Sequence, residues 1–142
     1  MTRLPSAVIA LIAVVNPQDQ VLLLKRGSDV HCPDVWSFPG GKVETDELPL
    51  QAAVRELEEE VGIKGKHWRH VAKHTHTYKD RKLSFLLFFC RFDGDISKHH
   101  VEGDSMWCPI ESLPDITMPD ANKHLVEMLL DCYHDGLFPS RG

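Results

Sequence analysis

The 142-residue sequence has only four cysteines, and no two of them form a C-x-x-C pair. Zinc sites and the disulfide frameworks of small secreted proteins depend on closely patterned cysteines, so neither is expected here. Cys32, Cys90, Cys108 and Cys132 are instead expected to be reduced thiols, which is the usual state in the cytosol.

Long apolar runs are also lacking. The run near the start, residues 7–15, is too short to span a bilayer, and no signal-peptide pattern precedes it. We therefore expect a cytoplasmic protein without a membrane partner.

An excess of positive charge is the third absence. The chain has 16 lysines and arginines against 21 aspartates and glutamates, and its net charge is −5. Such a balance does not suggest a surface for polyanions, so polymeric nucleic acid is not an expected partner. Because the composition is ordinary, with 42% hydrophobic residues and neither repeats nor low-complexity segments, residues 1–142 are expected to form one domain.

Glutamate, in contrast, is concentrated in one short stretch. Glu56, Glu58, Glu59 and Glu60 occupy four of five consecutive positions. On a helix Glu56, Glu59 and Glu60 share a face, because residues three and four apart are neighbours, whereas Glu58 points elsewhere. Clustered carboxylates suit a hard divalent cation, which binds oxygen ligands and phosphates. The alternative is a solvated acidic helix face.

The residues around these glutamates favour a site over a solvated face. Leu50, Val54, Leu57 and Val61 recur at helical spacing and predict a buried stripe on the opposite side of the helix. Upstream, the sequence Phe-Pro-Gly-Gly at 38–41 interrupts regular structure, and glycines let the backbone approach a ligand closely. A loop of about eight residues is then expected to lead into the helix.

Residues 41–63 resemble the signature of the Nudix hydrolases, in which a glycine, a glutamate and an Arg-Glu-x-x-Glu-Glu core recur at fixed spacing. Every specified position of that signature is matched, by Gly41, Glu47, Arg55, Glu56, Leu57, Glu59, Glu60, Gly62 and Ile63. The resemblance implies an α/β (α+β) sandwich, with a mixed β-sheet between helices.

The local sequence patterns agree with such a fold. Strands are predicted at 6–15, 21–25, 36–38, 68–78, 82–92 and 105–108, and helices at 49–61, 109–113 and 120–135. The first two strands are expected to form a hairpin around residues 16–20. Residues 83–90 are nearly all apolar, which is typical of a central strand.

The sequence at Lys25-Arg26, at 38–44, at Asp80-Arg81 and at 118–122 extends the resemblance to one branch of this family, the MutT-type nucleoside triphosphate pyrophosphohydrolases. It implies that the carbonyl of Gly40 holds metal together with Glu56, Glu59, Glu60 and, from a later loop, Glu102. It also implies that Glu56, Glu59 and Arg26 are catalytic. The substrate would be contacted by Arg26, Phe38, Arg81 and Asn122. Glu47 and Arg55 are expected to brace the loop and the metal ligands without touching metal.

Each of these assignments has a simpler alternative. Arg26 could be a solvated charge at a strand end, and Arg81 an exposed turn residue. Phe38 could belong to the core, and Asn122 could cap a helix. Glu102 lies closer to the following Trp107 than the MutT-type pattern suggests, so its role stays open.

Two histidines outside the signature, His74 and His76, alternate on a predicted strand. They could line a cleft, although solvated strand histidines are commoner.

The resemblance implies Mg²⁺-dependent hydrolysis, with Mn²⁺ as a possible substitute, of a nucleoside triphosphate to a nucleoside monophosphate and pyrophosphate. A glutamate-activated water would attack phosphorus. The substrate could instead be another nucleoside diphosphate derivative, such as a dinucleoside polyphosphate or a nucleotide sugar, and a non-catalytic nucleotide sensor is a third option. A monomer or a homodimer is expected.

Overall fold

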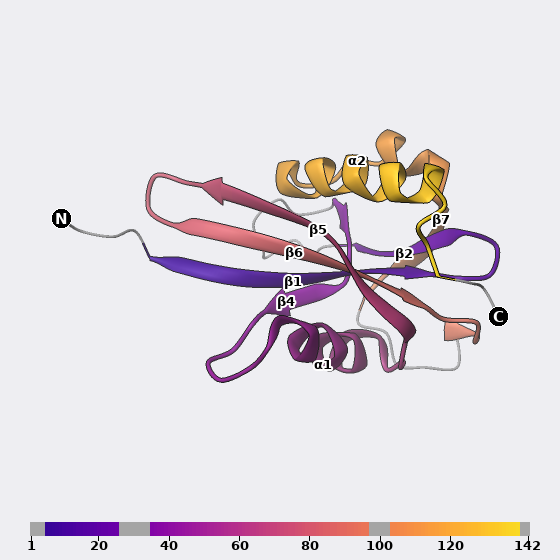
Figure 1. The fold of residues 1–142 in the computed structure, drawn as a ribbon, viewed down its shortest axis with the longest axis horizontal. Coiled ribbons are helices and arrows are strands. Elements are labelled where there is room, and N and C mark those ends of the chain that lie inside the picture. The colour runs from indigo at the N-terminus through magenta and orange to yellow at the C-terminus, as the bar shows by residue number, and fades with distance from the viewer. Residues whose placement is uncertain (1–4, 26–34, 97–102, 140–142) are drawn as a thin grey trace.

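The structure is a computed structural model that describes residues 5–25, 35–96 and 103–139. Figure 1 shows three layers, a mixed β-sheet with helix α1 (Pro49–Val61) on one face and helix α2 (Asp120–His134) on the other. This is the expected α/β sandwich.

The sheet within the described ranges has seven strands, in the order β3-β2-β1-β6-β5, with β4 beside β1 and β7 beside β2. Their bounds are β1 Ser6–Val15, β2 Gln20–Lys25, β3 Trp36–Ser37, β4 Gly40–Lys42, β5 Lys66–Thr77, β6 Lys82–Arg91 and β7 Ser105–Pro109. A 3₁₀ helix, η2 (Ile110–Asp115), stands between β7 and α2.

Strand β1 lies inside the sheet and is covered on both faces. Leu11 and Ala13 pack in the core beneath α2, whereas Ile12 and Val14 pack in the core beneath α1. Because successive side chains of a strand point to opposite faces, a strand that is buried twice needs an unbroken apolar run. The bounds predicted for this strand are confirmed.

Strands β1 and β6 run parallel over ten residue pairs, from Ser6 opposite Lys82 to Val15 opposite Arg91. The other strand pairings are antiparallel. Strand β6 therefore lies between β1 and β5, as its apolar sequence predicts for an interior strand.

The predicted hairpin of the first two strands is confirmed at its turn but does not extend along the strands. Val15 and Val21 are the one pair that β1 and β2 share. On the same edge of β1, residues Ile9–Leu11 bond instead to β4, a strand that was predicted as loop. Strand β2 turns away and pairs with β7 along Gln20–Leu24.

Helix α1 has the predicted bounds, with a proline in its first turn and Gly62 in the left-handed conformation (φ 74°) at its C-terminus. Its buried face differs from the prediction. Ala52 and Ala53 are fully buried with Leu57 and Val61, whereas Leu50 is 42% exposed. The helix lies close to β1 and β4, where the small alanine side chains allow a short approach.

A buried polar network joins the end of the sheet where β1 and β6 finish to helix α2. Arg91 of β6 lies 3.2 Å from Asp19 in the turn after β1, and it donates to the carbonyls of Asn16 and Pro139. The Tyr133 hydroxyl of α2 donates to the other Asp19 oxygen at 3.0 Å. The network therefore fixes four separate segments of the chain to one another.

Three of the four cysteines fall in the described ranges, and Cys90, Cys108 and Cys132 are free. Burial raises the pKa of the Cys90 thiol and contributes most to the raised pKa of Cys108. Among the residues that are described, no helix is long and apolar enough to cross a membrane.

Candidate active site

The carboxylates of α1 lie against the two glycines of β4. Glu60 accepts a hydrogen bond from the Gly40 N–H at 3.1 Å. A β-carbon on Gly41 would lie only 2.5 Å from the carboxyl group of Glu56, so this position must be glycine for Glu56 to keep its place. Glu56 and Glu60 thus face the same short strand. Glu58 points away and lies 3.7 Å from Lys64.

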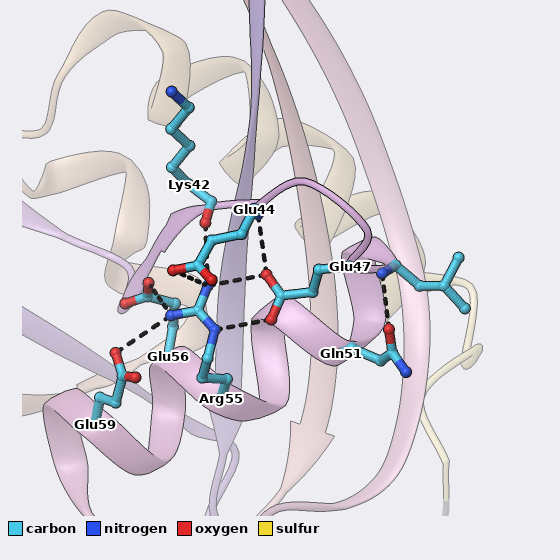
Figure 2. A network of polar contacts seen from close by, with 8 residues as sticks. Lys42, Glu44, Glu47, Gln51, Arg55, Glu56 and Glu59 are labelled. Carbon is cyan, nitrogen blue, oxygen red and sulfur yellow. Dashed lines mark hydrogen bonds and ion pairs between the residues drawn. The ribbon is translucent and has the colours of Figure 1, made fainter.

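Arg55 lies at the centre of the glutamates, as Figure 2 shows. Its Nε and Nη2 atoms donate to the two oxygens of Glu47 at 2.8 and 3.0 Å. Its Nη1 atom donates to Glu56 at 2.8 Å and to Glu59 at 3.3 Å. One planar cation therefore holds three carboxylates that would otherwise repel one another.

The same arginine secures the loop between β4 and α1. Nη2 of Arg55 also donates to the carbonyl of Lys42 at 3.1 Å, and the Glu44 N–H donates to Glu47 at 3.0 Å. The hydrogen bonds from Arg55, followed by that from Glu44, lower the pKa of Glu47 to about 2. Hydrogen bonds to Glu47 and Glu56 raise the pKa of Arg55. Both groups stay charged at neutral pH, so they act as braces and not as proton carriers.

The donor chemistry of the cluster fits a hard divalent cation, because carboxylate oxygens are the ligands such ions prefer. No three histidine, cysteine, aspartate or glutamate side chains in the described ranges already surround a common metal position. Glu56 is bound to Arg55, and Glu60 to the backbone of Gly40. A cation at these glutamates would therefore share their carboxylates with these partners or displace them.

A cavity of about 710 Å³ opens beside this cluster. It brings together five of the residues expected at the site, namely Phe38, Gly40, Glu60, Arg81 and Asn122. The other lining residues are Ile9, Leu11, Leu24, Lys25, Ser37, Gly41, His76, Tyr78, Leu83, Phe85, Gly103, Pro119, Asp120 and Ala121. Glu56, Glu59, Glu47 and Arg55 do not line it. Arg26 and Glu102 lie outside the described residues.

Asn122 is not the helix cap that was considered as its alternative role. The N-cap of α2 is Pro119, without a side-chain capping bond, and Asn122 is the third residue of the helix. Its side chain is buried at 5% exposure and its Oδ1 atom has no hydrogen-bond partner within the described part of the chain. An unpaired buried acceptor is costly, so a donor from a ligand would relieve it.

Phe38 is part of the core and also lies at the cavity, so its proposed contact with the substrate stays a prediction. The ring is 3% exposed and belongs to the core cluster beneath α2, and it also lines the cavity. Arg81, at the turn between β5 and β6, lies over the ring of Tyr78 at 5.4 Å and lines the cavity with it.

The two alternating histidines of β5, His74 and His76, have different neighbours in the structure. His76 lines the cavity, whereas His74 stacks on His124 of α2 with ring centroids 4.3 Å apart. Burial, followed by the nearby His124 and His76, lowers the pKa of His74.

Sequence reasoning did not identify Asp120 or the apolar lining residues of β1, β2 and β6, because their patterns are those of ordinary core strands and a helix start. No local signal could have identified them, since the cavity forms only where these separate elements meet.

Comparisons with known proteins identify the family of this chain. The sequence model of the NUDIX domain matches residues 5–129. The chain is 32% identical over 123 residues to the 8-oxo-dGTP diphosphatase of Escherichia coli K12, covering 85% of this chain and 94% of the relative. It is 30% identical over 119 residues to the CTP pyrophosphohydrolase of the same organism, covering 83% and 87% of the two chains.

Among solved structures, the MutT protein of Methanosarcina mazei Go1 superposes with a TM-score of 0.80 over 94% of this chain and 99% of that one. The two sequences are 20% identical, so this likeness concerns the fold.

Proposed function

This chain belongs to the NUDIX domain family and is a nucleotide pyrophosphohydrolase, and within that class we propose that it cleaves a nucleoside triphosphate to a nucleoside monophosphate and pyrophosphate with Mg²⁺. One observation carries the choice of substrate. A single cavity has the carboxylate of Glu60 and the backbone of Gly40 in its lining, together with the unpaired amide oxygen of Asn122. A phosphate chain and a base need two such different environments.

The metal would be held by Glu56, Glu59, Glu60 and the carbonyl of Gly40. Nudix hydrolases depend on divalent metals in general, and a bound cation supplies charge neutralisation for the phosphates. The chain's own contribution is positional. Arg55 orients Glu56 and Glu59 on the helix. Glu59 is the more exposed of these two, and we assign to it or to Glu56 the acceptance of a proton from the attacking water.

The base would lie between Phe38 and Asn122, and Arg81 with Tyr78 would close the same side of the cavity. Asn122 would accept a hydrogen bond from a base N–H through Oδ1, which removes the unpaired buried acceptor. Arg26 and Glu102 keep their sequence-based roles in the proposal, as a phosphate contact and a further metal ligand.

A second candidate substrate is a dinucleoside polyphosphate. The observation in its favour is the position of Tyr78, whose ring lines the cavity between His76 and Arg81 and could stack on a second base. Nucleotide sugars have no comparable support, because they carry no second aromatic group.

The test is a panel of nucleoside triphosphates, including oxidised ones, with a dinucleoside polyphosphate and a nucleotide sugar, assayed with Mg²⁺ and with Mn²⁺. Release of pyrophosphate from triphosphates, with the highest kcat/KM in the panel, supports the proposal. Release of orthophosphate from triphosphates, or a preference for a dinucleoside polyphosphate, contradicts it. Activity without added divalent metal and with a chelator present would contradict the metal assignment.

A further inference from the structure

The part of the cavity wall that α2 supplies comes from the start of the helix alone. Pro119, Asp120, Ala121 and Asn122 line the cavity, and none of the later residues of α2, all of which are described, does so. Pro119 makes no side-chain capping bond, and within the described part of the chain no hydrogen bond joins residues 119–124 to the sheet. The position of Asn122 therefore depends on how the side chains of α2 pack against the sheet.

Two kinds of contact hold the N-terminal part of α2 in place. Beneath the helix, Ala121 and Leu125 are buried in the core cluster between α2 and the sheet. At the side of the helix, the exposed ring of His124 stacks on His74 of β5, with ring centroids 4.3 Å apart and ring planes inclined by 18°. Neither histidine lines the cavity, so any effect of the stack on a bound nucleotide must pass through neighbouring residues.

A pair of histidines is a costly way to make such a contact. The Nε2 atom of His74 is buried and has no hydrogen-bond partner within the described residues. Burial, followed by the nearby His124 and His76, lowers the pKa of His74. Phenylalanine at both positions would stack without either cost. What the histidines add is a contact that changes with protonation in the range near neutral pH.

The surroundings of the stack do not neutralise an added proton. The charged and titratable groups nearest to it along the adjoining elements are His76 and Tyr78 on β5, Arg81 in the turn after β5, and Asp120, Lys123 and Glu127 on α2. Their fixed charges at neutral pH, two positive and two negative, cancel, and Lys123 lies 3.5 Å from Asp120. The residue of β6 opposite His74 is Phe85, which is uncharged, and Lys73 points to the other face of the sheet. Two protonated rings at this separation would therefore repel each other.

We propose that the stack of His74 on His124 positions the first turn of α2 for recognition of the nucleotide base, and that protonation of the pair weakens this recognition. The inference deepens the proposed function and rests on it, because it acts through Asn122. While the rings are uncharged, the turn stays against β5. As the pH falls below about 6.5, the ordinary pKa of histidine, the rings gain protons, the pair separates and Asn122 moves away from the base. The proposed metal ligands of α1 lie on the other face of the sheet (Figure 1), so the chemical step is unchanged.

The first experiment observes the coupling between the stack and the helix without any nucleotide. In isotope-labelled protein, NMR follows the ring signals of His74 and His124 and the backbone amide signals of Ala121 and Asn122 between pH of about 5 and about 8. The two amide signals should shift with the same midpoint as the His74 ring. In His124→Phe, which keeps a stacked ring that cannot be protonated, this shift should be largely lost. Amide signals that do not follow His74, or that follow it equally in His124→Phe, would overturn the inference.

The second experiment measures base discrimination, as the ratio of kcat/KM between a preferred and a disfavoured nucleoside triphosphate. This ratio cancels the pH dependence of the chemical step, which both substrates share. For the wild type it should fall about fivefold, through KM, between pH of about 7.5 and about 5.5, because about that much binding is lost with one aromatic stack. In His124→Phe the ratio should stay high at both pH values. In His124→Ala, which has no stack, it should be low at both.

His134→Ala is the matched control, because His134 is the other histidine of α2 and lies at the far end of the helix, 2.6 Å from Glu111. This variant should reproduce the wild-type ratio at both pH values. A wild-type ratio that does not change with pH, or one that falls equally in His124→Phe, would overturn the inference. Equal ratios in His124→Ala and His134→Ala would also overturn it. If the wild type hydrolyses no triphosphate, the proposed function is refuted instead, and the NMR experiment alone decides whether the stack positions the helix.

Discussion

At the scale of single residues, the glutamates of α1 differ in what they contact. Glu60 accepts the Gly40 N–H and lines the cavity, and Glu56 is held by Arg55 against Gly41. Glu58 contacts Lys64 at the exposed side of the helix. Three neighbouring carboxylates of one helix therefore have unequal access to a ligand in the cavity.

From this difference we predict that Glu56→Gln and Glu60→Gln each lower kcat by about 100-fold or more, because each would remove a charged ligand of the proposed metal. Glu58→Gln should change kcat less than about twofold, and it serves as the matched control. Steady-state kinetics with Mg²⁺, alongside circular dichroism to establish that the fold is retained, provide the measurement. Comparable losses at positions 58 and 60 would refute the assignment of the helix face.

Asn122 gives a second prediction at this scale. If its buried amide reads the base, Asn122→Ala should alter the ranking of nucleotides by kcat/KM, because a site built to hydrogen-bond a group loses discrimination without its partner. Since Asn122 makes no capping bond, no capping contribution of about 1 kcal/mol should be lost from stability. A substrate panel beside urea denaturation measures both quantities. An unchanged ranking with lowered stability would mean a structural role.

The position of Asn122 also shows what the sequence could not provide. The chain reads Met-Pro-Asp-Ala-Asn before an amphipathic stretch, and an asparagine near a helix start is a common cap. The helix begins at Asp120, as in the predicted range 120–135, so Asn122 is its third residue and its side chain lines the cavity. The sequence pattern placed the helix but could not decide between a cap and a cavity residue for Asn122, because the cavity forms only where separate elements meet.

At the scale of elements, β4 is the strand on which the site depends. Its residues are Gly-Gly-Lys, which have no strand propensity, so the pattern predicted a loop. The strand exists because its backbone bonds to Ile9–Leu11 of β1. Helix α1, in contrast, has apolar residues at helical spacing and β1 has an unbroken apolar run, and both were predicted with the observed bounds. Elements defined by their own side chains were thus predictable, and those defined by a distant partner were not.

The two glycines of β4 should respond differently to alanine. At Gly40, φ is 152° and a β-carbon would lie 2.1 Å from the carbonyl oxygen of Ala10, a backbone atom that cannot move alone. Gly40→Ala should therefore destabilise the fold by several kcal/mol, about 3 or more. At Gly41 the obstacle is the mobile end of Glu56, so Gly41→Ala should fold normally and lose activity. Urea denaturation and kcat for both variants decide the matter, and a stable Gly40→Ala would contradict the close approach of β4 to β1.

The stack of His74 and His124 between β5 and α2 predicts a pH effect. Because burial and neighbouring histidines lower the pKa of His74 from its ordinary value of about 6.5, protonation favours the unfolded state. Above pH of about 6.5 the group is neutral in both states and has no effect. As the pH falls below that value, the free energy of unfolding should decrease, and the decrease should continue until the pH reaches the lowered pKa of the folded state.

In His74→Gln this decrease should be smaller, as measured by urea denaturation at a series of pH values between about 7.5 and 5. His70→Gln is the matched control, because His70 is exposed on the same strand. If both substitutions reduce the pH dependence of the unfolding free energy equally, the stacked pair of His74 and His124 is not the cause of that dependence.

At the scale of the whole molecule, the network around Arg91 holds together segments that are distant in sequence. Arg91 and Asp19 are each 9% exposed in their side chains. Arg91→Met would leave the Asp19 carboxylate buried without its cation, which we predict to cost about 3 to 5 kcal/mol of unfolding free energy. Arg69→Met, which removes an exposed arginine with one bond to the Leu137 carbonyl, should cost less than about 1 kcal/mol. Urea denaturation measures both, and equal losses would contradict the burial of the network.

The parallel pairing of β1 with β6 determines how much of the chain must be synthesised before the sheet can form. Residue 6 pairs with residue 82 and residue 15 with residue 91, so every contact of this pair closes a loop of 76 residues. On the ribosome, β4 can bond to three residues of β1 as soon as residue 42 has emerged, but the ten-residue parallel ladder must wait for residue 91. Until then an apolar strand remains without its main partner, which exposes the nascent chain to chaperones and to aggregation. High contact order of this kind also slows refolding from denaturant relative to a helical protein of equal length.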